Sequence, residues 1–309
     1  MSANGGFTDK IQVLEETAYG DGGSTGEIVF GNTIAFEWDA DTSTIQSYGL
    51  ETDGPQASFN TDGVLLVSGT HEWEITDGRE LKSIFGTIND GAGGTFDLDV
   101  ANTLPSYTVK VVDEFGDSKF KQIKGIKYGN ASIGLTREET IKVSAEWQGK
   151  VIEDTTTFTP TEPSVEPLSY LDGDLTIGST AQVDVDNFTL EIQRNNVARR
   201  FIESTSTGER RLISCIIEGP LNLSFNGEMS AKEQLIEEIL GGSSMQDVRT
   251  DKTVTLNMAR GSDTALNIPI TGARLTTNGR PMQKDNEVAI QSFDGVGRDI
   301  TATGTYPTS

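Results

Sequence analysis

The fold is decided by the stretch KGIKYGNASIGLTREETIKVSAEWQG, residues 124–149, and by its weaker copy TGARLTTNGRPMQKDNEVAIQSFDG, residues 271–295. In both stretches apolar and polar residues alternate on either side of a polar turn. This pattern is typical of antiparallel strands that bury one face of a sheet. Gly125 matches Gly272, and the closing glycine follows 24 residues later in the first copy and 23 residues later in the second. The pattern predicts a β protein with an internal duplication.

Further matches extend the predicted repeat beyond this pair. Its members agree in order, spacing and residue type: Lys127 with Arg274, Trp147 with Phe293, and the helix end KSIFG at Gly86 with EEILG at Gly241. Identity between the copies is low. The alternative is that any two β meanders with one helix look alike.

The rest of the chain also gives mainly strand signals. A short helix capped by Thr76 or Asp77 is predicted to end at Gly86, and a capping box at Ser230 predicts a second helix that ends at Gly241. Residues 40–62 are polar and are expected to form a long exposed loop, and the Gly-rich residues 86–106 a further loop.

The chain length and one Pro-rich segment give the domain prediction. A chain of 309 residues suggests two domains. The prolines of TTTFTPTEPSVEP, residues 155–167, indicate a linker or extended arm. We therefore predict a mostly β fold of two tandem β-sandwich or barrel units, each with one short helix. The first unit covers residues 1–154, the linker 155–170 and the second unit 171–309.

The charge is strongly acidic, with a formal net charge of −23 and a pI near 4.3. Two interpretations compete: a surface adapted to high salt, and a surface that repels a polyanion. Tight binding to the DNA backbone is disfavoured, because phosphate contacts need clustered Lys and Arg. The nearest basic cluster is interpreted as a set of salt-bridge partners for the acidic excess: Arg194, Arg199, Arg200, Arg210 and Arg211.

Residues that could support catalysis or metal binding are few. His71 is the only histidine and Cys215 the only cysteine, and neither has a catalytic motif around it. Four aspartates suggest a calcium site but lack the closing Glu of a calcium loop: Asp172, Asp174, Asp184 and Asp186. The glycines of residues 91–94 lack the lysine of a phosphate loop. We therefore expect no enzyme activity, no cofactor and no metal. The chain also has no signal-peptide pattern and no apolar run long enough for a membrane span.

The order of these motifs resembles the tail tube (major tail) proteins of tailed viruses. The resemblance is carried by SGTHEWEITDGRELKSIFG (68–86), by YTVKVVDEFGDSKFKQIKGIKYGNASIGLT (107–136) and by IKVSAEWQGK (141–150). It extends over nearly all of the chain, although its motifs are patterns of β structure and not chemical signatures. The acidic composition is similar to that of proteins from halophilic hosts, which suggests a virus of a halophilic archaeon.

The resemblance implies a function as a virion structural protein. Such proteins self-assemble into stacked rings, with inner β-hairpins around a lumen through which DNA is delivered without specific binding. The long loop would reach the neighbouring ring, and other tail proteins would cap the tube. A duplicated chain favours a trimer with pseudo-sixfold symmetry over a hexamer. The protein would be assembled in the host cytoplasm and would reside in the virion tail, with no membrane partner. The candidate lumen residues are the acidic residues near the hairpins 107–128 and 254–275: Asp113, Glu114, Asp117 and Asp263.

Two other functions remain open at this stage. One is another tail component with a tube-like fold, such as a distal tail or hub protein. The other is a β-sandwich adhesin or carbohydrate-binding module. An adhesin would stay discrete in solution and bind a glycan, whereas a tube protein would form rings or polymers.

Overall fold

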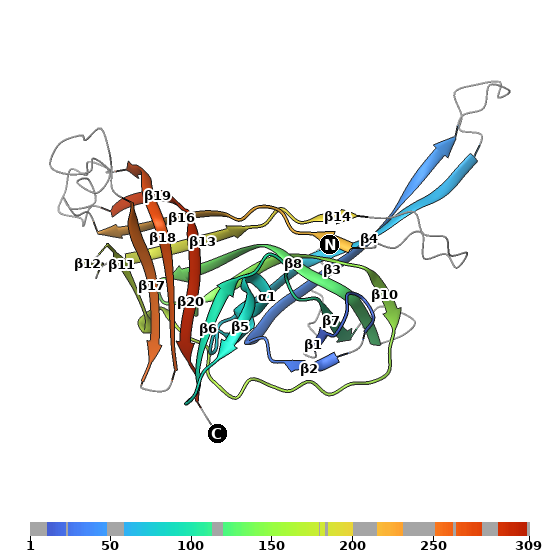
Figure 1. The fold of residues 1–309 in the computed structure, drawn as a ribbon, viewed down its shortest axis with the longest axis horizontal. Coiled ribbons are helices and arrows are strands. Elements are labelled where there is room, and N and C mark those ends of the chain that lie inside the picture. The colour runs from blue at the N-terminus through green and yellow to red at the C-terminus, as the bar shows by residue number, and fades with distance from the viewer. Residues whose placement is uncertain are drawn as a thin grey trace.

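The structure is a computed structural model of the 309-residue chain. It describes residues 11–22, 24–47, 59–112, 120–178, 180–182, 185–199, 215–230, 251–261, 264–279 and 290–307. The fold is mostly β, as predicted, and all strand pairs within the described residues are antiparallel (Figure 1).

The widest sheet, called here the wide sheet, has eight strands. In spatial order they are β3 (Asn32–Ser47), β4 (Phe59–Glu74), β9 (Lys142–Gly149), β8 (Phe120–Thr136), β13 (Val185–Gln193), β16 (Asn222–Ser230), β19 (Ile290–Gly297) and β18 (Thr264–Gly279). The first four strands come from the first half of the chain and the last four from the second half.

Two further sheets continue from the wide sheet, because β8 and β18 are long enough to belong to two sheets each. The first has the order β2 (Ser24–Ile28), β1 (Ile11–Glu16), β7 (Tyr107–Val112), β8 and β10 (Val151–Asp154). The second has the order β12 (Thr180–Gln182), β11 (Gly173–Ile177), β17 (Lys252–Arg260), β18, β20 (Asp299–Thr305), β6 (Thr95–Val100) and β5 (Gly86–Asp90). A separate pair is formed by β14 (Val197–Arg199) and β15 (Cys215–Ile217).

The order of pairing is the same in the two halves of the chain. The series β2–β1–β7–β8–β10 corresponds to β12–β11–β17–β18–β20, and β3–β4–β9–β8 corresponds to β13–β16–β19–β18. The β5–β6 hairpin belongs to the first half alone among the described strands, and it extends the sheet of the second half by pairing with β20.

The matched glycines Gly125 and Gly272 lie at equivalent bends of β8 and β18. Their φ angles are 70° and 62°, in the left-handed region that favours glycine. The residue that follows β9, Lys150, donates its N–H to Lys124 O, and the residue that follows β19, Arg298, donates to Thr271 O. Each strand therefore leaves the wide sheet at its glycine and enters the adjoining sheet.

The two halves join along one seam, where β8 pairs with β13 from Ala131↔Ile192 to Thr136↔Asn187. Their buried side chains belong to a single hydrophobic cluster. A buried ion pair between Lys127 Nζ and Glu218 Oε1, 2.6 Å apart, also joins the halves. The seam is thus an edge-to-edge joint between two sets of four strands.

Short helical segments cover part of this core. The 3-10 turn η1 (Arg79–Leu81) leads into α1 (Lys82–Phe85), and a second 3-10 turn, η2 (Tyr170–Asp172), precedes β11. The N-cap of η1 is Gly78 and no side chain caps it, so neither expected cap, Thr76 or Asp77, holds that position. Asp77 Oδ1 accepts a hydrogen bond from the N–H of Arg79 at 3.0 Å. The second predicted helix, up to Gly241, lies outside the described residues.

Two loop predictions need correction. Residues 40–47 and 59–62 belong to β3 and β4, and residues 86–90 and 95–100 form β5 and β6. The β3–β4 hairpin runs on beyond the last β4–β9 pair, Val67↔Gly149, and so has no core to impose an apolar alternation. The predicted turn at 91–94 does connect β5 to β6.

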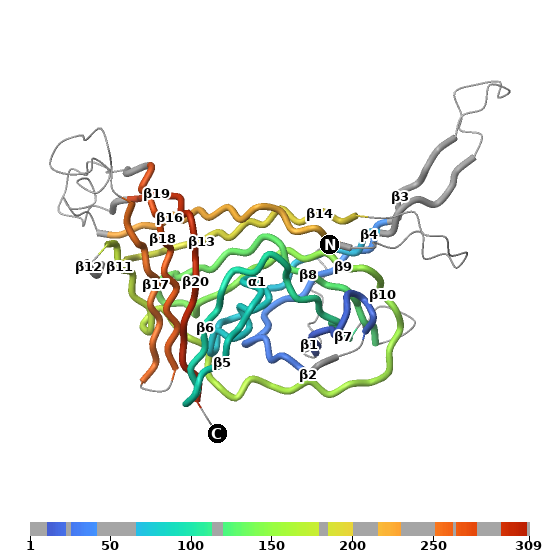
Figure 2. Tube along the Cα trace, viewed as in Figure 1, coloured from blue at the N-terminus to red at the C-terminus, as the bar shows by residue number. Residues whose placement is uncertain are grey.

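The Pro-rich segment, residues 155–167, contains no helix or strand, as predicted. Figure 2 shows this part of the chain, in yellow-green, passing along β2. The contact is made by Thr161, whose N–H donates to Glu27 Oε1 at 2.7 Å. The segment therefore lies against the first half and connects it to the second.

His71 is fully buried in β4, and this gives a testable pH dependence. Its Nδ1 lies 2.8 Å from Tyr128 Oη, and burial lowers the pKa of His71 from 6.5 to about 3. The unfolded chain therefore takes up this proton first, and the stability present above pH 6.5 is lost as the pH falls toward 3. From pH 6.5 to 4.5 we expect a loss of roughly 2–3 kcal/mol in the free energy of unfolding, at about 1.4 kcal/mol per pH unit.

Urea unfolding of the wild type and of His71→Gln at several pH values measures this effect. The variant lacks the titrating group but keeps the same carboxylates. The difference between the two slopes of unfolding free energy against pH therefore isolates the contribution of His71. Parallel slopes below pH 6.5 would contradict the assignment.

Candidate assembly surface

The wide sheet buries one face and leaves the other open. On β9, Val143, Ala145 and Trp147 are buried, whereas Lys142 and Glu146 are exposed. Registered partners point to the same side of a sheet, so the open face can be followed from strand to strand. One row of partners crosses all eight strands: Ala35, Glu72, Ser144, Ser132, Glu191, Ser224, Val296 and Arg274.

The side chains of this open face are mostly polar or acidic. Its acidic members, by register, are Glu37, Asp39, Asp41, Glu72, Glu74, Glu146, Glu191, Glu228 and Asp294. The basic side chains in the same rows are Lys127, which is buried and paired with Glu218, Lys142 and Arg274. Several of the carboxylates bond to neutral neighbours: Glu146 accepts from Asn130 Nδ2 at 2.9 Å, and Glu228 from Asn187 Nδ2 at 2.8 Å. The open face is therefore hydrophilic with an excess of negative charge.

The two outer strands of the wide sheet are β3 and β18. Within the described residues, β3 pairs with β4 alone along its whole length, and β18 beyond Ala273 pairs with β19 alone. Such edges present backbone N–H and C=O groups that another strand can pair with. Among the described strands, each end of the wide sheet is thus an outer strand with a single partner in that sheet.

Trp38 on β3 is the counterpart of Phe188 on β13. Trp38 pairs with Gly69 of β4, and Phe188 pairs with Gly227 of β16. Each of these glycines lies against the matched aromatic residue of the next strand, Trp147 or Phe293, at 2.7 Å from the position of an added Cβ. Phe188 is 0% exposed because β8 covers its edge, whereas Trp38 is 37% exposed. Sequence reasoning missed Trp38, although its place in an EWD triplet beside a strand pattern was visible.

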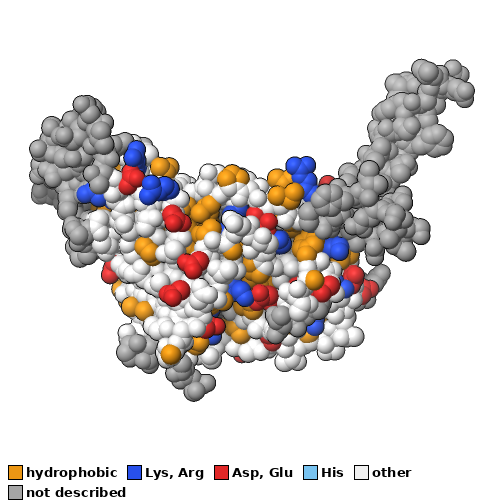
Figure 3. Space-filling model, viewed as in Figure 1, with side chains coloured by type: hydrophobic (Ala, Val, Ile, Leu, Met, Phe, Trp, Pro, Cys, Tyr) orange, Lys and Arg blue, Asp and Glu red, His pale blue; other side chains and the backbone are white. Residues whose placement is uncertain are grey.

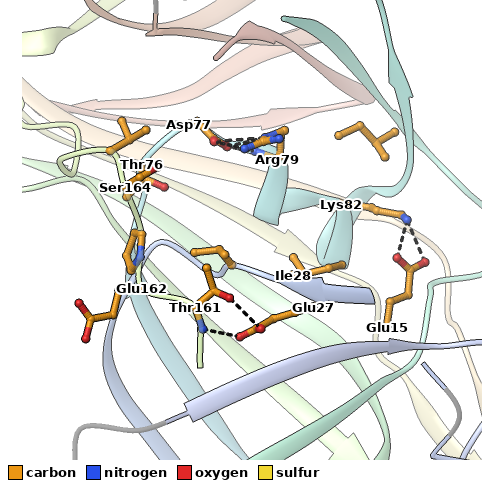
Figure 4. Close-up of a pocket in the computed structure, with 14 residues that line it drawn as sticks. Glu15, Glu27, Ile28, Thr76, Asp77, Arg79, Lys82, Thr161, Glu162 and Ser164 are labelled. Carbon is orange, nitrogen blue, oxygen red and sulfur yellow. Dashed lines mark hydrogen bonds and ion pairs between the residues drawn. The ribbon is translucent and has the colours of Figure 1, made fainter. Parts of the chain in front are cut away.

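A separate cleft of about 430 Å³ lies between β1, β2, the η1–α1 turn and the Pro-rich segment (Figure 4). Four of its charged side chains form two ion pairs, and Glu27 accepts hydrogen bonds from Thr161. Lys82 Nζ lies 2.7 Å from Glu15 Oε2, and Arg79 Nη2 lies 2.6 Å from Asp77 Oδ2. These pairs leave the cleft without a converging set of unpaired charges that would mark a ligand.

The buried Glu80 lies behind this cleft, in η1. Burial, together with the charge of Asp77, raises the pKa of Glu80 to about 8. Its Oε1 accepts a hydrogen bond from the N–H of Thr76 at 3.2 Å. Since Glu80 is fully buried, it is not exposed to a ligand.

The candidate lumen residues Asp113, Glu114, Asp117 and Asp263 lie outside the described residues. The structure directs attention instead to the open face of the wide sheet, which sequence reasoning missed. Once the strands are placed, the alternation of residues such as Glu72, Glu74 and Glu146 would have found it.

The aspartates considered for calcium do not converge. Asp172 bonds to Arg260 at 2.6 Å, Asp174 to Asn257 at 2.7 Å and Asp186 to Arg137 at 3.2 Å, and Asp184 is outside the described residues. No group of three or more His, Cys, Asp or Glu side chains in the described ranges is arranged to hold a metal ion. In the same part of the chain, no helix has the length and apolarity needed to span a membrane.

The predicted salt-bridge cluster also differs from expectation where the structure describes it. Arg194 is buried and donates to two backbone carbonyls, Ala101 O at 2.7 Å and Phe85 O at 3.0 Å. On the face drawn in Figure 3, acidic and basic side chains are interspersed with hydrophobic ones, without a large patch of one charge.

No protein-family model matches the chain, and no curated protein is significantly similar to it.

Proposed function

We propose that the chain is a non-enzymatic virion structural protein, a tail tube subunit that self-assembles into stacked rings for DNA delivery. In this proposal the two halves are tandem tube-type units. The protein resides in the virion tail of a tailed virus with a halophilic host, and other tail proteins close the ends of the tube. The observation that carries the proposal is the β8–β13 seam, an edge-to-edge joint already made within one chain.

The directions of the strands support repetition of this joint between chains. Each strand of the wide sheet is antiparallel to its neighbours, and the number of strands is even. As a result, β18 of one copy would run antiparallel to β3 of the next, as β8 does to β13. Joining β18 to β3 then repeats the internal seam and closes a barrel without edges.

Barrel geometry favours three copies in each ring. With strands about 4.8 Å apart and tilted by about 40°, three copies of eight strands give a barrel about 48 Å across between backbones. On the same basis, two copies give a barrel diameter of about 32 Å, and inward side chains would narrow that lumen further. Six copies give a diameter of about 96 Å. A trimer with pseudo-sixfold symmetry suits a single DNA duplex best.

The charge of the open face agrees with a conduit for DNA. In the barrel this face lines the lumen, and its carboxylates repel the phosphate backbone. A protein that neutralises phosphates with Lys or Arg would bind DNA tightly and oppose its movement. The acidic lining therefore favours passage without binding.

Electron microscopy of the purified chain at low and high salt tests the proposal. We expect rings or tubes with threefold symmetry and a central hole. Discrete monomers at every salt concentration, together with glycan binding, would favour an adhesin instead. Single rings that never stack would favour a distal tail or hub protein.

Reversing charge on the open face is expected to make the tube retain DNA. In Glu146→Lys/Glu228→Lys the exposed side chains change sign while the buried face stays intact, so assembly should survive. At low salt, co-sedimentation with linear duplex DNA should rise at least tenfold over the wild type and fall steeply as salt is added.

The matched control is Glu162→Lys/Glu166→Lys, which makes the same charge change in the exposed Pro-rich segment. Its DNA retention should rise only as far as the change in net charge alone predicts. Equal retention by both variants would contradict the assignment of the open face to the lumen.

A further inference from the structure

The hairpin formed by β13 and β16 continues into β14 and β15, and together these strands form what we call the second arm. The second arm lies against the first half of its own chain. Arg194 donates to Phe85 O and Ala101 O, and Asn196 Nδ2 donates to Tyr128 O at 2.9 Å. Glu218, next to β15, pairs with Lys127. The second arm therefore contacts the first half of the chain, the same half with which β13 pairs at the seam.

The β3–β4 hairpin, which we call the first arm, is the counterpart of the second arm. From Asp41↔Leu66 to Ser47↔Phe59 its two strands pair with each other alone among the described strands. Figure 1 shows it projecting away from the rest of the wide sheet. Among the described residues, no strand pairs with the outer side of β3.

The outer parts of the two arms, beyond the wide sheet, carry opposite charge. Residues 41–66 contain four Asp and Glu residues and no Lys or Arg. Residues 194–217 of the second arm contain five Arg and two Glu, a net charge of +3 (5 − 2). The receiving side also carries positive charge: Arg274, the counterpart of Lys127, is 53% exposed while paired with Asp251 at 2.5 Å.

We propose that the first arm is a lateral clasp, which grips the second unit of the neighbouring copy in the same ring. It would lie over the start of the wide-sheet part of β18, near Arg274, in the way the second arm lies over β8 near Lys127. Its acidic strands would then lie toward residues 194–217 of that copy, the basic part of its second arm. This inference rests on the proposed ring, and it assigns the β3–β4 projection to contact within a ring and not to contact between stacked rings.

Shortening the arm separates these two roles. In the test variant, residues 42–65 are replaced by Asn-Gly, a favoured two-residue hairpin turn that connects Asp41 to Leu66. Circular dichroism and thermal unfolding establish that the variant is folded, and light scattering with electron microscopy measures assembly. We expect a folded monomer and at least a tenfold rise in the concentration needed for rings.

A charge-reversal variant, Asp39→Lys/Asp41→Lys, tests the same contact with the arm left in place. Both side chains are exposed in the single chain, so the fold should be unaffected. Assembly at low salt should be impaired, with partial recovery at high salt, because screening weakens the new repulsion. The matched control is Asp97→Lys/Asp99→Lys on β6, which changes the charge equally at two exposed positions outside the wide sheet and should assemble like the wild type.

The outcomes are distinguishable. Wild-type chains that form no rings overturn both the proposed function and the clasp. Two results would overturn the clasp alone, provided that the wild type forms tubes. In one, the shortened chain forms normal rings that do not stack. In the other, the shortened chain assembles fully. Should the shortened chain fail to fold, the charge-reversal pair decides: equal assembly by both Lys variants overturns the clasp.

Discussion

Trp38→Lys is expected to abolish ring formation while the chain stays folded. Trp38 is 37% exposed at the outer edge of the sheet, so a lysine there can direct its ammonium group to solvent in the single chain. In a ring, β18 of the next copy would cover it as β8 covers Phe188, and a lysine would have to be buried without a partner. The cost of about 3 kcal/mol or more for each joint would raise the assembly concentration by over a hundredfold.

Sedimentation velocity across a range of protein concentrations measures this effect. The control is Leu171→Lys, which changes the most exposed of the large hydrophobic side chains in the described ranges, at 90%, on η2 outside the wide sheet. The control should assemble as the wild type does. Rings formed by Trp38→Lys at wild-type concentrations would exclude β3 as the joining edge.

Gly125→Ala is expected to destabilise the single chain strongly, by roughly 3 kcal/mol. Its φ of 70° strains any residue with a side chain, and the added Cβ would lie 2.8 Å from Lys150 Cβ and 3.2 Å from the Tyr19 ring. The N–H of Gly125 itself donates a hydrogen bond to the buried Glu16 Oε1 at 2.9 Å, so the bend cannot shift freely.

Chemical unfolding compares this variant with Gly134→Ala on the same strand. At Gly134 the nearest atom to an added Cβ is Lys142 O at 4.0 Å, so that substitution should change stability by less than about 0.5 kcal/mol. Gly272→Ala should behave as Gly125→Ala does, because its Cβ would meet Arg298 Cβ at 2.8 Å. Similar stability for all three variants would contradict the role given to the two bends.

The local parts of the fold could be predicted from the sequence. The alternation around Tyr107–Val112 and Thr140–Val151 marks strands that bury one face. The match of Gly125 with Gly272 found two bends whose backbone needs glycine. The end of α1 at Gly86 follows from short-range chemistry in the same way.

The non-local parts could not be predicted. The pairing of β8 with β13 joins strands about fifty residues apart, and no local pattern specifies which edge meets which. The outer part of the β3–β4 hairpin carries no apolar alternation because it covers no core, so its sequence predicts a loop. A sequence marks hairpin turns and their acidic residues directly, whereas the open face appears only when eight strands are in register.

The seam inside the chain also has a consequence for the kinetics of assembly. A joint between two units of one chain forms at an effective concentration set by the tether, in the millimolar range for short linkers, whatever the amount of protein. Every second joint of a six-unit ring would therefore be complete as soon as each chain folds. In the proposed ring, yield would depend on the third power of protein concentration in place of the sixth, so rings could close while the subunit is still scarce.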